Sequence, residues 1–265
     1  MGRFHRHDDG PNHEHGQDND RDHDQGHDHG DMTGYRTGPE RVRVLERIFD
    51  ENDRCADANR TILDAAGVVA VNMMSSPGAG KTAILRHTLA SLSDATRVGV
   101  IEGDIETSID ADRLAGFGAQ IALLNTSNGF GGECHLDAPM VASALARLDL
   151  DAVDLLFIEN VGNLVCPAEF DVGAHHSVMV YSITEGEEKP LKYPVMFRSV
   201  ELVLVNKLDL LPHLDFDLAL FRRNLASVNP AVTMLDVSAR SAEGLGAWYG
   251  WLAEHGRHRG GSTSV

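Results

Sequence analysis

The clearest chemical signal in the sequence is a glycine-rich segment at residues 75–82, which reads SSPGAGKT. It follows an apolar run and precedes a helical run, which is the setting in which a P-loop binds phosphates. Glycines let backbone N–H groups approach phosphate oxygens, and the N-terminus of the following helix adds a favourable dipole. Ser75 replaces the first glycine of the pattern. The predicted nucleotide contacts here are Gly78, Ala79, Gly80, Lys81 and Thr82.

The predicted catalytic residues are Lys81, Asp104 and Glu159. Lys81 is expected to reach the β and γ phosphates, and the Thr82 hydroxyl to bind Mg²⁺. Asp104 follows an apolar run and is expected to contact Mg²⁺ or to position water. Glu159 begins the sequence ENVG, where GTPases usually carry Asp-x-x-Gly, so it would hold Mg²⁺ through water. The alternative for either carboxylate is a strand-end cap.

A second motif lies near the end of the chain and concerns the base. Residues 206–209 read NKLD after an apolar run and resemble the guanine-recognition motif of GTPases. A carboxylate at Asp209 can accept hydrogen bonds from N1 and N2 of guanine, which adenine does not offer. Residues 238–240 resemble the accessory guanine loop. GTP is therefore the expected nucleotide, and the predicted base-site residues are Asn206, Lys207, Asp209, Ser238 and Ala239.

Two short cysteine-containing segments could bind a transition metal. Cys134 and His135 are adjacent in a glycine-rich loop, and Cys166 follows about thirty residues later. Thiolate and imidazole ligands together suit zinc or nickel. The alternative is that these are buried structural thiols. The chain has three cysteines, an odd number that does not describe a disulfide framework and fits a reducing compartment.

Seven apolar runs alternate with helical segments and predict buried parallel strands. A helix is expected over residues 39–66, with proline in its first turn and glycine at its end. The expected fold class is α/β: a doubly wound, mostly parallel sheet of the P-loop NTPase type, similar to the SIMIBI G domains, with ligands at the carboxyl ends of the strands. The runs are residues 68–74, 98–101, 120–124, 154–158, 178–183, 200–205 and 232–237.

Composition limits the choice of partners. The chain has 265 residues, 42% of them hydrophobic, and a formal net charge of −17. This charge argues against nucleic acid or an anionic membrane as the principal partner. No apolar run approaches the ~20 residues that a membrane helix needs. Charged and His residues stand where a signal peptide would be apolar, so we expect a cytoplasmic protein.

The two ends of the chain differ from the middle. Residues 1–37 consist largely of His, Asp, Gly and Asn and are expected to be disordered, as are residues 256–265, leaving one GTPase domain with its N-terminal helix at 38–255. A His-rich tract offers imidazole ligands for nickel, zinc or copper, although a merely solvated tail or an expression tag is the alternative. The tail histidines singled out are His5, His7, His13, His15, His23, His27 and His29.

Several segments together resemble one family, the hydrogenase nickel-incorporation GTPases called HypB. They are residues 75–82, 134–138 (CHLDA), 159–167 (ENVGNLVCP), 184–192 (TEGEEKPLK) and 206–209, and the resemblance runs from about residue 39 to 251. It implies slow GTP hydrolysis that drives nickel delivery to the large subunit of [NiFe]-hydrogenase. It also implies a GTP-promoted homodimer and a small zinc-containing partner, HypA. Cys134, His135 and Cys166 match the family's Ni or Zn ligands near the dimer interface.

The sequence departs from some HypB proteins in its N-terminal tail. It lacks their Cys-x-x-Cys-Gly-Cys nickel site and carries the His-rich tail instead, for which storage or buffering of nickel is expected. Two other functions remain open. One is a urease accessory GTPase, although that family's Cys-Pro-His motif is absent because Ala168 follows Pro167. The other is a nickel-storage protein whose nucleotide site only sets its oligomeric state.

The spacing of the motifs suggests a mechanism. Cys166 lies seven residues after Glu159 and four after Gly162. Segments of this kind are ordered by γ-phosphate and Mg²⁺ and relax after hydrolysis. We expect Cys166 to shift more than Cys134 and His135, which would make metal affinity depend on the nucleotide, and nucleotide affinity on the metal.

Overall fold

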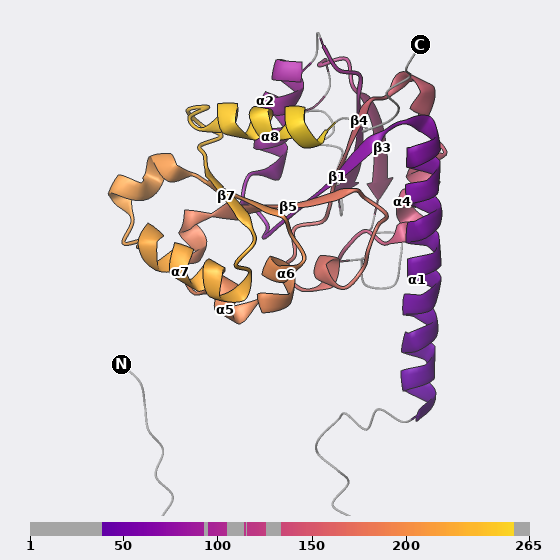
Figure 1. Ribbon diagram of the computed structural model, residues 1–265, viewed down its shortest axis with the longest axis horizontal. Coiled ribbons are helices and arrows are strands. Elements are labelled where there is room, and N and C mark those ends of the chain that lie inside the picture. Colours follow the sequence, from indigo (N-terminus) through magenta and orange to yellow (C-terminus); the bar gives the residue numbers. More distant parts are fainter. Residues whose placement is uncertain (1–38, 93–94, 105–113, 115, 126–133, 257–265) are drawn as a thin grey trace, which may run out of the picture.

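The fold is built on one sheet of seven strands, all parallel, in the order β3-β2-β4-β1-β5-β6-β7 (Figure 1). The computed structural model describes residues 39–92, 95–104, 114, 116–125 and 134–256. The predicted tails at residues 1–37 and 256–265 lie outside this range, except for Gly256, which is described and buried. The strands are β1 Val69–Ser75, β2 Val98–Asp104, β3 Gln120–Asn125, β4 Leu155–Glu159, β5 His176–Ser182, β6 Leu202–Asn206 and β7 Thr233–Asp236.

Helices and short 3₁₀ turns connect the strands and cover both faces of the sheet. The helices are α1 Pro39–Ala66, α2 Lys81–Leu92, α4 Ala138–Leu145, α5 Lys189–Lys192, α6 Pro194–Arg198, α7 Leu218–Val228 and α8 Leu245–His255. The 3₁₀ turns are η2 Leu150–Ala152, η3 Cys166–Ala168, η4 Ile183–Glu185 and η5 Leu208–His213. Within the described ranges, no helix is both long and apolar enough to cross a bilayer.

Alternate residues of each strand point to opposite faces, so one set of strands supplies two cores. On one face α2 and α8 pack on β1, β2, β4, β5 and β6 through residues such as Leu85 and Trp248. On the other face α1 and α4 cover the β3–β1 half, while α6 and α7 cover the β5–β7 half. Figure 1 shows α2 with α8 on one side of the sheet and α1 with α4 on the other.

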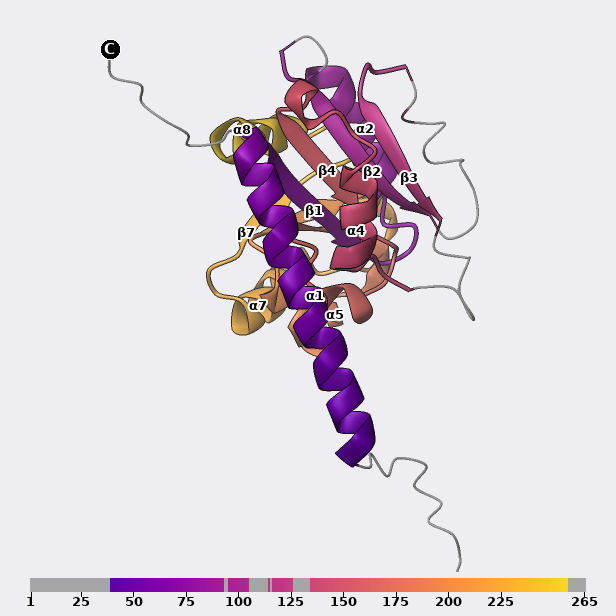
Figure 2. The same cartoon turned by 90° about the vertical axis from the view of Figure 1, so that its right-hand side faces the viewer.

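The helix α1 is the longest element, with 28 residues, and it extends beyond the sheet at its N-terminal end (Figure 2). Its C-terminal part is anchored by Leu63, which is fully buried, and by two buried asparagines. Asn52 accepts a hydrogen bond from the Ala138 N–H at 2.9 Å, and Asn59 donates to the Ala138 carbonyl at 2.9 Å. These bonds fix α1 to the start of α4, which follows the Cys134–His135 segment.

The structure confirms the expected fold class. All seven predicted strands are present, with ends shifted by at most a few residues, and the helix predicted over 39–66 has those bounds. The largest extension is in β2, which continues past the apolar run to Asp104. The carboxyl end of a strand can therefore consist of polar residues, and a pattern of apolar residues does not predict that part of the strand.

One buried hydrogen bond joins the two helices on the α2–α8 face. The indole Nε1 of Trp248 donates to the Thr88 hydroxyl at 2.9 Å, and both residues are fully buried. We expect Thr88→Val, which keeps the shape, to lower the free energy of unfolding by about 1–3 kcal/mol because it leaves a buried N–H unpaired. Urea unfolding measures this. Thr88→Ser keeps the hydroxyl and should lose less; an equal loss would show that packing, not the hydrogen bond, matters.

Candidate nucleotide and metal sites

The predicted site residues gather at the carboxyl edge of the sheet. The chain leaves β1 at Ser75 into the glycine-rich loop, and α2 begins at Lys81, so the loop connects a buried strand to a helix N-terminus. Glu159 and Asn206 are the last residues of β4 and β6. A parallel sheet brings these strand ends together although they are far apart in sequence.

The loop conformation suits a phosphate-binding turn. Gly78 and Gly80 have φ angles of +71° and +105°, a region that other residues rarely adopt. At Gly80, a Cβ atom would also lie 2.5 Å from the Asn206 amide nitrogen. Lys81 is 9% exposed, and its ammonium donates to the Ser75 hydroxyl at 2.8 Å. The serine that replaces the expected glycine therefore supplies a partner for the lysine.

The residues expected at the magnesium site are partly in place. The Thr82 hydroxyl donates to Oε1 of Glu159 at 2.6 Å, and Glu159 is 3% exposed. Asp104 is the last residue of β2, but its side chain lies outside the described part of the structure. The pairing of Thr82 with Glu159 gives an oxygen-rich position beside the loop, which suits a hard cation such as Mg²⁺. The catalytic and magnesium roles remain predictions.

The base-recognition residues form a second cluster that is tied to the loop. The Asn206 amide donates to the Ala79 carbonyl at 2.8 Å, and its oxygen accepts from the Ala239 N–H at 2.9 Å. The Lys207 ammonium donates to the Gly78 carbonyl at 2.7 Å. These contacts bring the predicted phosphate and base residues into one continuous site.

Asp209, the residue expected to read guanine, is oriented by a neighbour. The Ser238 hydroxyl donates to Asp209 Oδ1 at 2.6 Å, and it also accepts from the Ser241 N–H at 3.2 Å. One carboxylate oxygen is therefore held from the side of the accessory loop. Such an arrangement fixes the direction of the carboxylate before a base arrives.

The three predicted metal ligands also converge. Sγ of Cys134 lies 2.7 Å from Sγ of Cys166 and 3.6 Å from Nδ1 of His135. One donor atom from each residue lies within 4.8 Å of the others, and among the described residues this is the group with metal-ligand geometry. The His135 ring stacks on Phe170 with centroids 4.2 Å apart. Two sulfurs and one imidazole suit nickel or zinc, and three protein ligands leave a coordination position open.

Two polar residues of this region were not predicted from the sequence. Glu102 is 3% exposed and stands opposite Glu159 in the β2–β4 register. Asn160 is 1% exposed and accepts a hydrogen bond from the N–H of Leu136. The sequence IEGD, which ends in the predicted Asp104, offered a weak signal for Glu102. Leu136, whose N–H bonds to the Asn160 side chain, lies 24 residues away, so no local pattern could reveal this contact.

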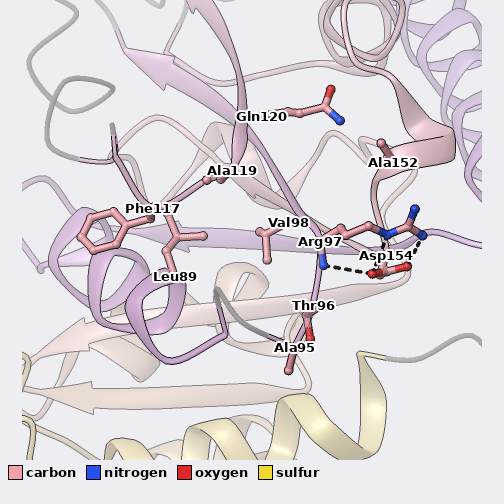
Figure 3. A pocket seen from close by; sticks show the side chains of 11 residues that line it. Leu89, Ala95, Thr96, Arg97, Val98, Phe117, Ala119, Gln120, Ala152 and Asp154 are labelled. Carbon is pink, nitrogen blue, oxygen red and sulfur yellow. Dashed lines mark hydrogen bonds and ion pairs between the residues drawn. The ribbon is translucent and has the colours of Figure 1, made fainter.

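A cavity of about 530 Å³ lies at the opposite, amino edge of the sheet (Figure 3). Its charged and amide side chains already have partners. Arg97 forms hydrogen bonds with Asp154, which lower the pKa of that carboxyl, and Gln120 bonds to the backbone of Asp149. The volume alone does not indicate a ligand site, because no convergent polar group points to one.

The fold and the loop define a P-loop nucleotide-binding protein. Residues 69–236 match the family model described as the CobW/HypB/UreG nucleotide-binding domain. The hydrogenase maturation factor HypB of Azotobacter vinelandii is 49% identical over 211 residues, which cover 80% of this chain and 68% of that protein. The chain therefore belongs to the HypB family, which confirms the resemblance drawn from the motifs.

Two further comparisons bear on the site. The solved structure of HypB from Helicobacter pylori in complex with nickel has a TM-score of 0.73 and 33% identity, covering 81% of this chain and 99% of that chain. The hydrogenase/urease maturation factor HypB of Helicobacter hepaticus is 38% identical, over 77% of this chain and 84% of that protein.

The phosphate-binding loop is in direct contact with the segment that follows β4. A Cβ atom at Gly162 would lie 2.9 Å from Cα of Pro77. We expect Gly162→Ala to push this segment off the phosphate-binding loop at a cost of about 1–3 kcal/mol, which is roughly a five- to 150-fold loss in nucleoside triphosphate affinity. Titration with a fluorescent analogue measures this. Gly246→Ala, on α8 with open space around it, is the control, and unchanged affinity in Gly162→Ala would contradict the prediction.

Proposed function

We propose that the protein is a GTP-hydrolysing nickel metallochaperone that serves the maturation of a [NiFe]-hydrogenase. One observation carries this proposal: a single short segment contributes to both sites. It begins at Glu159, which bonds to Thr82 of the nucleotide site, and seven residues later it supplies Cys166 to the metal cluster. Nucleotide and metal chemistry thus share one short segment. Relatives named as hydrogenase maturation factors, one of them solved with nickel, support the choice of metal and task.

The nucleotide is GTP. Asp209 is held by Ser238 at the end of the site where a base would lie, and Asn206 links that end to the phosphate loop. A carboxylate fixed in this way accepts from two guanine donors, and adenine would leave it desolvated and unpaired. This asymmetry favours guanine strongly.

Hydrolysis would use the residues around the loop. The loop N–H groups and Lys81 bind and orient the phosphates, while Thr82 and Glu159 would hold Mg²⁺, with Asp104 as the further predicted carboxylate. Bound Mg²⁺ neutralises charge that develops on the phosphate oxygens. Gly162, in contact with Pro77, is placed to respond when the γ-phosphate leaves.

Nickel is the proposed cargo of the cluster, with Zn²⁺ as the competing ion. Cys134 is exposed, and His135 and Cys166 are partly exposed, so an ion here can be reached from outside. A three-ligand site with an open position suits an ion that is passed on, since structural zinc sites usually have four protein ligands. The tail histidines at residues 5–29 would store or buffer nickel before delivery.

A GTP-promoted homodimer is part of the proposal. Three exposed apolar residues lie on the segments around the cluster: Val165 at 52% exposure, Leu191 at 52% and Val195 at 55%. Val165 directly precedes the ligand Cys166, and α6, which carries Val195, packs against η3. Exposed apolar side chains on elements that contact one another suit the proposed interface between two copies.

The proposed partners are a HypA-type zinc-containing nickel chaperone and the hydrogenase large subunit. Nucleic acid and membranes are not proposed as partners, given the net charge of −17. The cytoplasm, where thiols stay reduced, is the proposed location, and none of the three cysteines, all of which the structure describes, forms a disulfide. A urease accessory role is the second candidate, because the Helicobacter hepaticus relative is named for both enzymes.

Nickel titration tests the proposal directly. Protein lacking residues 1–37 would be loaded with GDP or with a non-hydrolysable GTP analogue, beside the full chain. We expect the two nucleotide states to differ in nickel affinity by roughly five- to 150-fold, the usual range of allosteric coupling. Isothermal titration measures the affinities, and Zn²⁺ is titrated in parallel.

The control for this titration is Cys166→Ala, in which the nucleotide dependence should disappear. Tight binding that ignores the nucleotide would leave a GTPase with a structural metal and would contradict delivery. Binding only by the full chain would move nickel to the tail and favour storage. A pure store, moreover, need not hydrolyse GTP under turnover conditions.

Base recognition gives a separate prediction. Asp209→Asn removes the charged acceptor for guanine N1 and N2, and each charge-assisted bond contributes about 1.5–3 kcal/mol. GTP affinity should fall roughly a hundredfold or more. Xanthosine triphosphate, which carries a carbonyl at C2, should bind the variant better because an amide N–H can donate to it. Competition binding measures both, and an unchanged preference for GTP would mean that Asp209 does not contact the base.

A further inference from the structure

Asn160 lies between the nucleotide site and the metal cluster. It directly follows Glu159 at the end of β4 and is 1% exposed. Its side-chain oxygen accepts from the N–H of Leu136 at 3.0 Å, and its amide donates to Asn72 at 3.3 Å. Leu136 follows the metal ligand His135 in the chain. The side chain of Asn160 therefore joins the sheet to the loop that carries two of the three ligands.

Asn160 and both of its side-chain partners are themselves fixed to the sheet. The backbone N–H of Asn160 donates to the Met73 carbonyl on β1 at 3.0 Å. Its side-chain partner Asn72 is also on β1 and is 4% exposed. Leu136 is fully buried and packs so closely over β2 that a Cβ atom at Gly103 would lie 2.9 Å from it. Cys134 and His135 are thus tied to the middle of the sheet.

The third ligand belongs to a different part of the structure. Cys166 lies beyond Gly162, and Gly162 rests on Pro77 of the phosphate-binding loop. The amide of Asn163 donates to the Cys134 carbonyl at 3.2 Å, which links the two ligand-bearing segments at the cluster. Cys166 therefore belongs to a segment that contacts the phosphate-binding loop, and the Asn163 bond would carry Cys134 along with that segment unless another contact held it.

A metal site changes its affinity only when its ligands move relative to one another. If the Cys134–His135 loop were free to follow Cys166, the ion would be carried along with its coordination unchanged. We propose that Asn160 is the positioning residue that holds Cys134 and His135 to the sheet, so that displacement of Cys166 by the nucleotide state becomes a change in metal affinity. The inference rests on the proposed function, because it needs a nucleotide-dependent metal site.

The alternative is that Asn160 is simply a buried asparagine that stabilises the fold. Asn59 provides a matched control, because it is fully buried and donates to the carbonyls of Ala138 and Val172, neither of which lies in residues 134–136 or 160–166. Loss of either side chain removes buried hydrogen bonds near the metal loop. Only loss of the Asn160 side chain removes the link between that loop and the end of β4.

The test uses the full chain carrying Cys55→Ser, so that the remaining thiols are the two in the cluster. Nickel binding is followed by thiolate-to-nickel charge-transfer absorption, which does not report the tail imidazoles. Affinities are measured by chelator competition with GDP and with a non-hydrolysable GTP analogue. The readout is the ratio of the two affinities, which a general loss of stability does not change.

Asn160→Ala should still bind nickel and both nucleotides, but the ratio should fall to about one. Asn160→Asp keeps the oxygen that accepts from the Leu136 N–H and should preserve most of the ratio, as should Asn59→Ala. The inference would be overturned if Asn160→Ala kept the affinity ratio of the starting protein, or if Asn59→Ala lowered that ratio as much as Asn160→Ala does. Equal affinities in the starting protein would instead refute nucleotide-dependent delivery itself, and the inference with it.

A measurement without substitution at Asn160 covers the case in which Asn160→Ala does not fold. Hydrogen exchange of the Leu136 amide reports the anchor directly. It should be protected in both nucleotide states, while amides of residues 162–166 should differ between them. Exchange of the Leu136 amide that becomes fast in either state would show that the loop is not held, and would overturn the inference.

Discussion

The uniform direction of the seven strands is the constraint on which the rest of the structure depends. Because every strand runs the same way, all of their carboxyl ends lie at one edge, and side chains from distant parts of the chain meet there. Glu159 reaches Thr82 across 77 residues, and Asn206 reaches Ala79 across 127. Turning one strand around would remove its polar end from this edge without changing its apolar core.

Buried polar groups at these strand ends connect the sites to the scaffold. Asn72, Glu102, Glu159, Asn160 and Asn206 are each at most 4% exposed, a degree of burial that such residues seldom have without partners. The hydrogen-bonded amides among them, Asn72, Asn160 and Asn206, hold one geometry, because any shift breaks a bond in a medium of low dielectric. The core below them is ordinary apolar packing. The specificity of the edge therefore comes from a thin layer of amides and carboxylates above that core.

The sequence predicted the elements better than it predicted the contacts. Continuous apolar runs predicted every strand, because strands buried on both faces carry apolar residues at successive positions. β5 begins two residues before its predicted start, since His176 gives no apolar signal although it pairs with Val71. The motifs placed Lys81, Thr82 and Asp209 beside their neighbours. They could not reveal Asn160, whose partners on other segments are 24 and 88 residues away.

The hydrogen bond between Lys81 and Ser75 bears on the nucleotide-free protein. A buried ammonium without a partner is costly, and a P-loop that relied on phosphate alone to stabilise its lysine would resist emptying. Here the Ser75 hydroxyl gives the Lys81 ammonium a hydrogen-bond partner within the protein. Departure of the nucleotide then exchanges one partner for another rather than exposing a bare charge. The serine that replaces the first glycine of the pattern therefore positions the lysine from within the loop itself.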